Sequence, residues 1–332
     1  MIEALYRRIT KLTAKKIIPV ADWAKNNDIN LQSATNKAIR GTIPAFRVRG
    51  HWMIDKEAKA KIHSHVCLSK TILRGFEVFD ECRKKKRLYY YNFAIDEIKD
   101  GSAKTFNTIE DYYSGKVEGQ LSSKAESGIG VAIAEIKSRQ NKNIGTFELS
   151  LNSRENVMRY IVYQLLRDDS IAERFIRKVP AMNNKTKREI KEYLISLEAC
   201  TGFLDSLFDD AGVQFVFNDT RMPFIITAST STYMANPEEH YIIELTLTPN
   251  IAILLTDIES LKSTLNIDKG YGAITIKDEK WVREYNLSML LTARKNKPHI
   301  LVSSSRDAIV QALKDEQYKT EVSKLPFEKA PR

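Results

Sequence analysis

The chain has 332 residues, of which 43% are apolar and 28% are charged, and its net charge is +10. This composition excludes a disordered or collagen-like chain, and at roughly 150 residues per domain the length predicts about two domains. No run approaches the length of a membrane-spanning helix and no apolar core of a signal peptide follows the start, so we expect a cytoplasmic protein without membrane association.

The positive charge is concentrated at the start of the chain. Residues 1–63 contain 13 Lys or Arg and 5 Asp or Glu, a net of +8, whereas the other 269 residues contain 39 and 37, a net of +2. Such asymmetry is typical of a nucleic-acid-binding segment joined to an ordinary globular body, although a solvated basic surface without a partner gives the same pattern. The three cysteines include no Cys-x-x-Cys pair and predict no disulfide framework.

The segment from residue 19 to residue 41 predicts two short helices separated by a polar turn. Pro19 suits the first position of a helix, and residues 26–28 have turn chemistry. Ile29 then follows as an apolar side chain that we expect to be buried between the helices. Asn30 is the expected N-cap of a second helix from residue 31 to residue 40. The pattern is that of a helix-turn-helix.

The next segment predicts a small hairpin. Phe46 and Val48 alternate with Arg47 and Arg49, and Arg49-Gly50 predicts a tight turn. Trp52 and Ile54 then continue the apolar face, so we expect the hairpin to have one apolar and one basic side. Asp55 is expected to cap a third helix over residues 56–62.

In this interpretation the second helix reads bases and the hairpin is a wing. Gln and Asn pair with adenine edges, Ser and Thr contact bases or phosphates, and Lys and Arg neutralise phosphates. The expected DNA-binding residues are Gln32, Ser33, Thr35, Asn36, Lys37, Arg40, Arg47 and Arg49.

A family resemblance supports this interpretation. Ile18-Pro19-Val20, Trp23-Ala24 and above all Arg40-Gly41-Thr42-Ile43-Pro44 with Trp52-Met53-Ile54 resemble the excisionase-type helix-turn-helix family, relatives of the MerR-type regulators. The resemblance implies a winged helix-turn-helix that binds DNA. The same fold also serves protein contacts in some proteins.

The remainder of the chain predicts a mixed α+β domain over residues 64–315, followed by a charged tail over residues 316–332. We expect helices at 109–137, 152–166 with Ser153 as its cap, 185–207, 281–292 and 305–313. Strands are expected at 214–217, 224–228, 241–247, 251–255 and 300–303. The fold class is therefore α+β, with a small N-terminal winged helix-turn-helix domain over residues 1–63 and a larger mixed domain.

A second resemblance is diffuse and covers about residues 63–313. His65-Val66, Leu73-Arg74-Gly75-Phe76 and Phe224-Ile225-Ile226-Thr227 are similar to a bacterial domain of unknown function that opens with a His-Tyr-Val-Pro motif. The Asp and Pro of that family's second motif are missing here, because Ala228-Ser229-Thr230 follow Thr227. The resemblance implies a fold and no particular activity.

Several patterns in the sequence resemble parts of metal or catalytic sites. The spacing His63-x-His65-x-Cys67 resembles a set of metal ligands, but a fourth ligand is lacking, and we expect no metal and no other cofactor. Glu135-x-Lys137 resembles part of a nuclease site, but the segment reads as a helix. The acidic pairs at 168–169, 209–210 and 238–239 are predicted to be solvated loop tips.

The aromatic run at residues 89–93 follows the basic run at 83–87. This arrangement is typical of a charged turn that leads into a buried strand. It also fits a clamp for single-stranded nucleic acid.

The combined hypothesis is a DNA-binding protein of a bacterial mobile element, phage or defence system, which acts in the cytoplasm or on the nucleoid. Double-stranded DNA is the expected partner, and the second domain is expected to form a homodimer or to recruit a protein. One alternative is a DNA-targeted enzyme, a nuclease or nucleotide-directed effector, with His65, Asp219 and Asn286 as catalytic candidates and Asn218 beside them. Another is a protein-interaction inhibitor or adaptor. The sequence does not favour an enzyme, because it has no Walker loop, nucleophile elbow or dinucleotide fingerprint.

Overall fold

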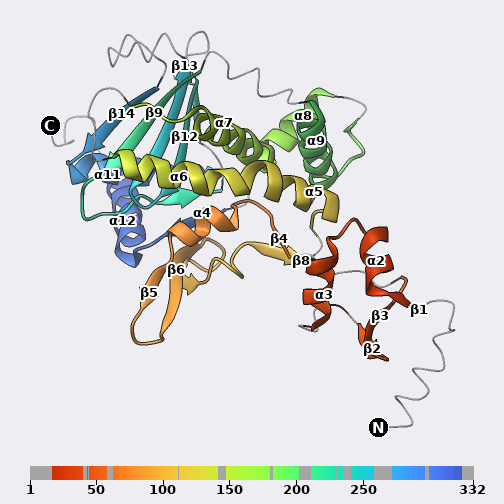
Figure 1. Cartoon of the computed structure of the whole chain (residues 1–332). Helices are drawn as coiled ribbons and strands as arrows, with labels where there is room; N and C mark the ends of the chain where they lie inside the picture. The colour runs from red at the N-terminus through yellow and green to blue at the C-terminus, as the bar shows by residue number, and fades with distance from the viewer. Residues whose placement is uncertain are drawn as a thin grey trace. The chain divides into compact units, whose positions relative to one another are not determined.

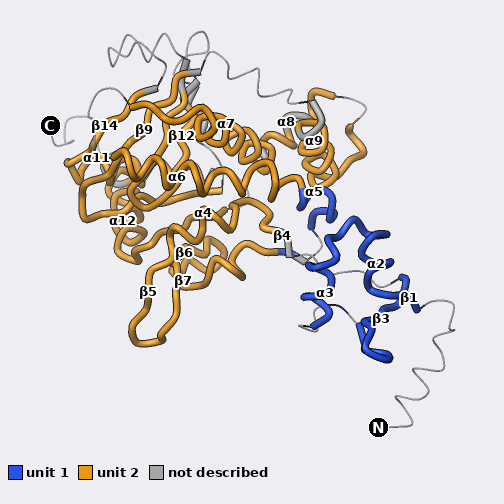
Figure 2. The backbone as a smooth tube through the Cα atoms, viewed as in Figure 1, with its two compact units in different colours: residues 1–64, 109–119 blue, residues 65–108, 120–332 orange. Residues whose placement is uncertain are grey.

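A computed structural model describes most of the chain in two compact units. The described residues are 17–39, 43, 45–57, 63–110, 112–140, 147–179, 182–201, 211–228, 231–234, 241–257, 271–295 and 299–323. The first unit comprises residues 1–64 and 109–119, and the second comprises residues 65–108 and 120–332 (Figure 2). The return of the chain to the first unit at residue 109 was not expected from the sequence.

The first unit has a three-stranded antiparallel sheet and two short helices in its N-terminal part (Figure 1). Its elements in chain order are β1 (Ile17–Pro19), α2 (Val20–Asn26), α3 (Leu31–Ile39), β2 (Phe46–Val48) and β3 (His51–Asp55). The strands have the order β1-β3-β2. One small core joins them, formed by Val20, Trp23, Ala24, Ala34, Ala38, Ile43 and Ile54.

The connection between α2 and α3 follows the sequence-based prediction closely. Asp28 adopts a positive φ of 52°, and the N–H of Ile29 donates to the carbonyl of Ala24 at 2.9 Å. Ile29 packs against the core. The Oδ1 atom of Asn30 accepts from the N–H of Gln32 at 2.9 Å, which confirms Asn30 as the cap of α3. Pro19 is itself the N-cap of α2 and ends β1, so its predicted place inside the helix was wrong by one residue.

The hairpin of β2 and β3 turns at Arg49 and Gly50, which have φ values of 45° and 85°. Two consecutive positive φ values in a two-residue connection are typical of a tight hairpin turn. The turn fixes the register, so Arg47 lies opposite Trp52 and Phe46 opposite Met53.

This register shows that the predicted division of the hairpin into an apolar side and a basic side was wrong. Opposite residues of an antiparallel pair share a face, and Trp52 and Ile54 contact the core. Arg47 therefore shares the core-facing side, whereas Phe46 and Val48 lie on the other face and are exposed. Beyond Asp55, residues 58–62 of the expected third helix lie outside the described residues.

The second unit contains a five-stranded sheet with the order β11-β12-β13-β9-β14 (Figure 1). Its strands are β9 (Ala211–Asn218), β11 (Ser231–Met234), β12 (Tyr241–Thr248), β13 (Ile251–Asp257) and β14 (Tyr271–Ile276). Neighbours are antiparallel except for β14 and β9, which are parallel. β14 was not predicted from the sequence.

Both faces of this sheet are covered. On one face Val216 and Ala252 belong to the main core with α11 (Glu279–Lys295) and α12 (Arg306–Ser323). On the other face the rings of Phe215 and Phe217 lie 4.9 and 5.6 Å from that of Phe147. Alternate residues of β9 therefore pack on opposite sides, as expected for a strand buried on both faces.

A second sheet has the order β10-β15-β6-β5, and β7 also pairs with β6. Its strands are β5 (Val78–Asp80), β6 (Lys85–Asn92), β7 (Glu97–Gly101), β10 (Ile226–Thr227) and β15 (Leu301–Ser303). The basic run at residues 83–87 forms the turn and first part of β6, which confirms the charged turn that leads into a strand. β4 (His63–His65) and β8 (Thr108–Glu110) form a separate two-stranded sheet.

The remaining helices of the second unit are α4 (Lys70–Gly75), α6 (Ser127–Arg139), α7 (Leu151–Leu166), α8 (Asp169–Lys178) and α9 (Lys187–Thr201), with a π-helical turn at Leu121–Glu126 before α6. The helix α5 (Gly115–Gln120) belongs to the first unit up to residue 119. Gly128 lets α6 approach α7 closely, because a Cβ atom there would lie 2.1 Å from Oδ1 of Asn156. The architecture is therefore α+β, as predicted.

Several predicted boundaries were wrong. The helix expected from residue 109 begins at Gly115, since Thr108–Glu110 pairs as a strand. Ser150, not Ser153, caps α7, because the Oγ of Ser150 accepts from the N–H of Ser153. α12 continues to Ser323, because Asp315 and Glu316 form ion pairs with Arg283 and Arg294 of α11 and fix its polar second half.

Among the helices that the structure describes, none combines the length and the apolar composition that crossing a membrane requires.

Candidate nucleic-acid interface

The exposed face of α3 is polar. Ala34 and Ala38 are buried in the core of the first unit, and each residue of an α-helix is rotated by about 100° from the previous one. Gln32 and Asn36 therefore lie on the side opposite the two alanines. Gln32 and Ser33 are exposed, and Thr35, Asn36 and Lys37 are half-buried.

The basic side chains that were expected to contact phosphates lie in different environments. Arg47 and Arg49 are exposed in the hairpin, and the guanidinium of Arg47 lies over the ring of Trp52 at 5.6 Å from its centroid. Lys37 occupies the last turn of α3. Arg40 lies outside the described residues, as do seven of the other cations that give residues 1–63 their excess charge.

The same region also exposes apolar side chains. Leu31 and Ile39, at the two ends of α3, are 53% and 63% exposed. Phe46 and Val48 of the hairpin are 39% and 45% exposed. These four side chains are available for contact with a partner protein.

The proposed metal ligands do not form a described site. Within the described residues, no group of three or more His, Cys, Asp or Glu side chains is placed to hold a metal ion. Cys67 is buried, and burial raises the pKa of its thiol to about 12. The side chain of His63 lies outside the described residues.

His65 is a neutral, half-buried histidine. Burial, more than any neighbouring charge, lowers its pKa to about 4, and Arg167, Lys70 and Arg74 also lower it while Glu126 raises it. Its Nδ1 atom is buried and makes no hydrogen bond with the described residues. A pKa this far below neutral makes the ring a weak base, so this environment does not favour His65 as a catalytic residue.

The other catalytic candidates are in different environments. Asn286 is buried on α11, where its Oδ1 accepts from the N–H of Ile225 at 2.8 Å and its Nδ2 donates to the carbonyl of Pro223 at 2.9 Å. Asp219 is exposed, and its N–H donates to the carbonyl of Ile276. Asn218 is buried and donates to the carbonyl of Met222. These contacts show that Asn286 and Asn218 fix the backbone of the segment that precedes β10.

The acidic pair at residues 168–169 is not a solvated loop tip, contrary to the sequence-based prediction. Asp168 is 4% exposed, and Asp169 forms an ion pair with Lys191, which is fully buried. Nearby, the guanidinium of Arg167 contacts Glu126 at 2.7 Å. The loop is buried because α9 packs against α8 and brings Lys191 to the carboxylate. The other two pairs, at 209–210 and 238–239, lie outside the described residues.

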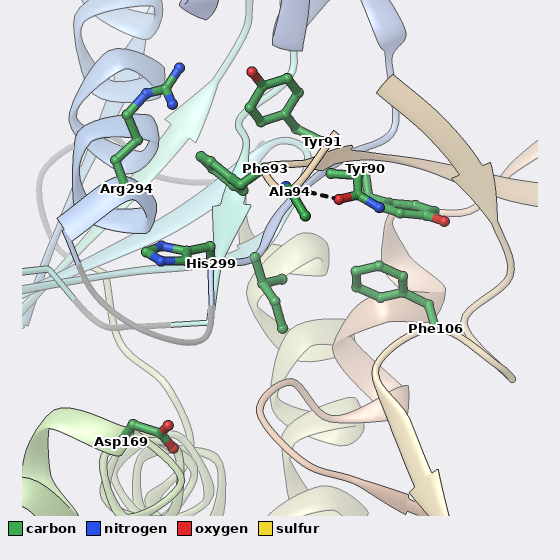
Figure 3. Close-up of a pocket in the computed structure, with 10 residues that line it drawn as sticks. Tyr90, Tyr91, Phe93, Ala94, Phe106, Asp169, Arg294 and His299 are labelled. Atoms are coloured by element: carbon green, nitrogen blue, oxygen red, sulfur yellow. Dashed lines mark hydrogen bonds between the residues drawn. The ribbon is translucent and has the colours of Figure 1, made fainter. Parts of the chain in front are cut away.

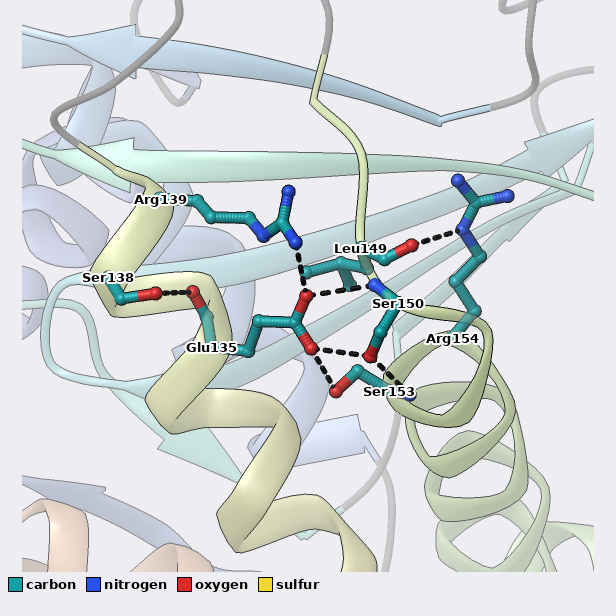
Figure 4. A network of polar contacts seen from close by, with 7 residues as sticks. All are labelled: Glu135, Ser138, Arg139, Leu149, Ser150, Ser153 and Arg154. Atoms are coloured by element: carbon teal, nitrogen blue, oxygen red, sulfur yellow. Dashed lines mark hydrogen bonds and ion pairs between the residues drawn. The ribbon is translucent and has the colours of Figure 1, made fainter.

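Glu135 makes hydrogen bonds that join two helices. It lies within α6, where two serines at the start of α7 surround its carboxylate (Figure 4). It accepts from the N–H and Oγ of Ser150 at 2.8 and 2.6 Å and from the Oγ of Ser153 at 2.5 Å. Burial raises its pKa, but these hydrogen bonds outweigh burial and lower the pKa to about 2. The carboxylate therefore joins α6 to α7, and its helical position does not support the nuclease interpretation.

The second unit contains a cavity of about 840 Å³ that we call the aromatic pocket. It is lined by Tyr90, Tyr91, Asn92, Phe93, Ala94, Phe106, Asp169, Arg294, His299 and Ile300 (Figure 3). The tyrosines and Phe93 belong to the aromatic run considered from the sequence. Phe106, Arg294 and His299 were missed because they come from separate segments with no motif of their own.

Comparison with family models, curated proteins and solved structures found no match for this chain. Its function is therefore argued from the residues and their geometry.

Proposed function

We propose that the N-terminal part of the first unit is a winged helix-turn-helix that binds double-stranded DNA. The observation that carries the proposal is the arrangement of α3, which buries Ala34 and Ala38 and directs Gln32 and Asn36 to the opposite side. Amide side chains at i and i+4 suit the donor and acceptor pattern of adenine in the major groove. The capped turn before α3 and the tight hairpin after it support the same interpretation.

In this proposal the arginines of the hairpin contact the phosphate backbone. Arg47 is held beside the ring of Trp52 before DNA binds, and Arg49 is exposed at the turn of the hairpin. The surplus of eight positive charges in residues 1–63 supplies attraction to a polyanion. The second unit acts as a dimerisation or partner-binding domain, because one small winged module makes few contacts by itself.

The proposal is tested by fluorescence anisotropy of a labelled random duplex with the full chain. We expect saturable binding that unlabelled duplex competes away. The double variant Arg47→Ala/Arg49→Ala should bind at least about tenfold more weakly, and Arg221→Ala, which removes an exposed arginine from the second unit, is the matched control. Equal binding by all three proteins would refute the placement of the interface.

A second candidate function is a protein-interaction module that uses the same unit. The exposed apolar side chains Leu31, Ile39, Phe46 and Val48 favour it, since DNA backbones offer such side chains little to bind. The discriminating variant is Ile39→Ser in the full chain. Loss of a partner protein or of self-association, with DNA binding unchanged, would favour this second function.

A further inference from the structure

The aromatic pocket has two pairs of rings with a small side chain between them. Tyr90 and Phe106 form one pair, with ring centroids 4.7 Å apart, and Phe93 and His299 form the other at 5.7 Å. Figure 3 shows the pairs on opposite sides of Ala94. Both pairs line the same cavity, so each offers an aromatic surface on which a flat ring of a ligand can stack.

Arg294 extends the apolar wall and is unsuited to capture a free anion. Its guanidinium lies 5.5 Å from the ring centroid of Phe93 and 5.8 Å from that of Tyr91. Its Nε and one terminal nitrogen contact the two carboxylate oxygens of Glu316 at 2.5 and 2.8 Å. The planar group is thus fixed by the carboxylate, which neutralises much of its charge.

Two side chains that can accept hydrogen bonds, His299 and Asp169, line the same pocket. His299 shares a hydrogen bond of 2.7 Å between its Nδ1 and the carbonyl of Ala293. A carbonyl oxygen only accepts, so Nδ1 carries the proton, and in this tautomer Nε2 is the ring nitrogen left to accept a hydrogen bond. Asp169 provides a carboxylate at another edge of the pocket (Figure 3), with 20% of its side chain exposed. Its ion pairs with Lys191 and Lys187 leave some acceptor positions of the carboxylate unused.

We propose that the aromatic pocket binds a purine nucleoside. The paired rings stack on the base, and Asp169 and His299 accept from the N–H groups of the base edge. Guanosine is the best probe because its base carries N–H donors at both the ring and the exocyclic nitrogen. The volume of about 840 Å³ is within the usual range for small-molecule sites. The inference is independent of DNA binding, because every residue that lines the pocket belongs to the second unit.

The test is isothermal titration of guanosine into the full chain. We expect saturable binding at one site, with ribose showing none and guanosine 5′-monophosphate binding within about threefold of guanosine. Tyr90→Leu and Phe106→Leu each remove one stacking ring and should weaken binding by about tenfold or more. Phe79→Leu is the matched control, since Phe79 is an exposed ring of the same sheet that does not line the pocket.

Three results would overturn the inference. The first is no binding of guanosine at millimolar concentration to a chain whose thermal unfolding is cooperative. The second is unchanged affinity in both Tyr90→Leu and Phe106→Leu. The third is much tighter, salt-dependent binding of a single-stranded oligonucleotide that guanosine does not displace, which would assign the aromatic residues to a nucleic-acid strand. The variant Gln32→Ala/Asn36→Ala separates the two proposals, because it should leave guanosine binding unchanged.

Discussion

Arg47 lies over the indole of Trp52 on the core-facing side of the hairpin, directly opposite it in the β2–β3 register. The two-residue turn at Arg49 and Gly50 sets this pairing, so a local backbone feature positions a cation that the proposal assigns to DNA. Stacking on an aromatic ring limits the conformations of the long side chain before a partner binds.

The stacking leads to a prediction for Trp52→Leu. The variant keeps an apolar side chain against the core but removes the ring under Arg47, so the arginine must be ordered when DNA binds. We expect DNA affinity to fall by about threefold, less than for Arg47→Ala, and the effect to vanish in an Arg47→Ala background. A double-mutant cycle measured by anisotropy checks this, and additive losses would contradict the coupling.

Gln32 and Asn36 are predicted to determine sequence preference and not general affinity. Their replacement by alanine removes base contacts worth about 1–3 kcal/mol each but no phosphate contact. In a selection from random duplexes, we expect the wild-type chain to enrich a motif that the double variant does not enrich. Both proteins should keep the same dependence of affinity on salt. The same motif from both would place base recognition elsewhere.

The carboxylate of Glu135 is predicted to stabilise the second unit at neutral pH. Glu135→Gln keeps the shape but removes the charge that three donors bind, and should lower the free energy of unfolding by about 2 kcal/mol. Arg139→Gln is the control, because it removes only the half-exposed ion pair on the same helix. Denaturant unfolding measures both, and equal small effects would contradict the assigned role.

The pH dependence of Glu135 follows from the direction of its shift. The pKa in the folded chain is about 2 and the unfolded value is 4.5, so the folded state favours the ionised form. The contribution of the ionised Glu135 to the free energy of unfolding is therefore complete above about pH 4.5, and it is lost as the pH falls toward 2. The stability difference between wild type and Glu135→Gln should shrink over this window. A difference that stays constant from pH 6 to pH 3 would be inconsistent with the shift.

Asn286 is predicted to be structural. Asn286→Leu would leave the buried N–H of Ile225 and the half-buried carbonyl of Pro223 without their partner, at a cost of about 2–4 kcal/mol. Thermal unfolding should therefore begin at a clearly lower temperature, whereas Asp219→Ala, which alters an exposed side chain, should have little effect. A stable Asn286→Leu chain that has lost an activity would instead support the catalytic interpretation.

The cysteines are predicted to differ in reactivity. Cys67 is buried with its pKa raised to about 12, whereas Cys82 is exposed. At pH 8 iodoacetamide should alkylate Cys82 in the native chain and Cys67 only after denaturation. Peptide mapping by mass spectrometry distinguishes the two sites. Native alkylation of Cys67 at a comparable rate would show that its surroundings open readily.

Sequence reasoning succeeded where neighbours along the chain determine the structure. The cap at Asn30 and the turn at Arg49-Gly50 involve residues within three positions of each other, so residue type alone specifies them. The faces of the hairpin were assigned wrongly because alternation shows two faces but not which one meets the core. The register of the turn decides that.

The candidate sites of the second unit depend on contacts between distant segments. The pair Lys191–Asp169 joins residues 22 positions apart, and no periodicity indicates it. The aromatic run at Tyr90 was visible in the sequence, but its partners Phe106 and His299 were not, since the pocket forms only when β6, β15 and α11 pack together. Long-range packing therefore limited what the sequence could predict.

The proposed function requires that the first unit presents its arginines to a DNA backbone. The most direct test is the salt dependence of duplex binding by the full chain and by Arg47→Ala/Arg49→Ala, with Arg221→Ala as control. Each lost phosphate contact lowers the slope of log affinity against log salt by about 0.9, so the account predicts a slope smaller by about two in the double variant and unchanged in the control. Identical slopes for all three proteins would contradict it.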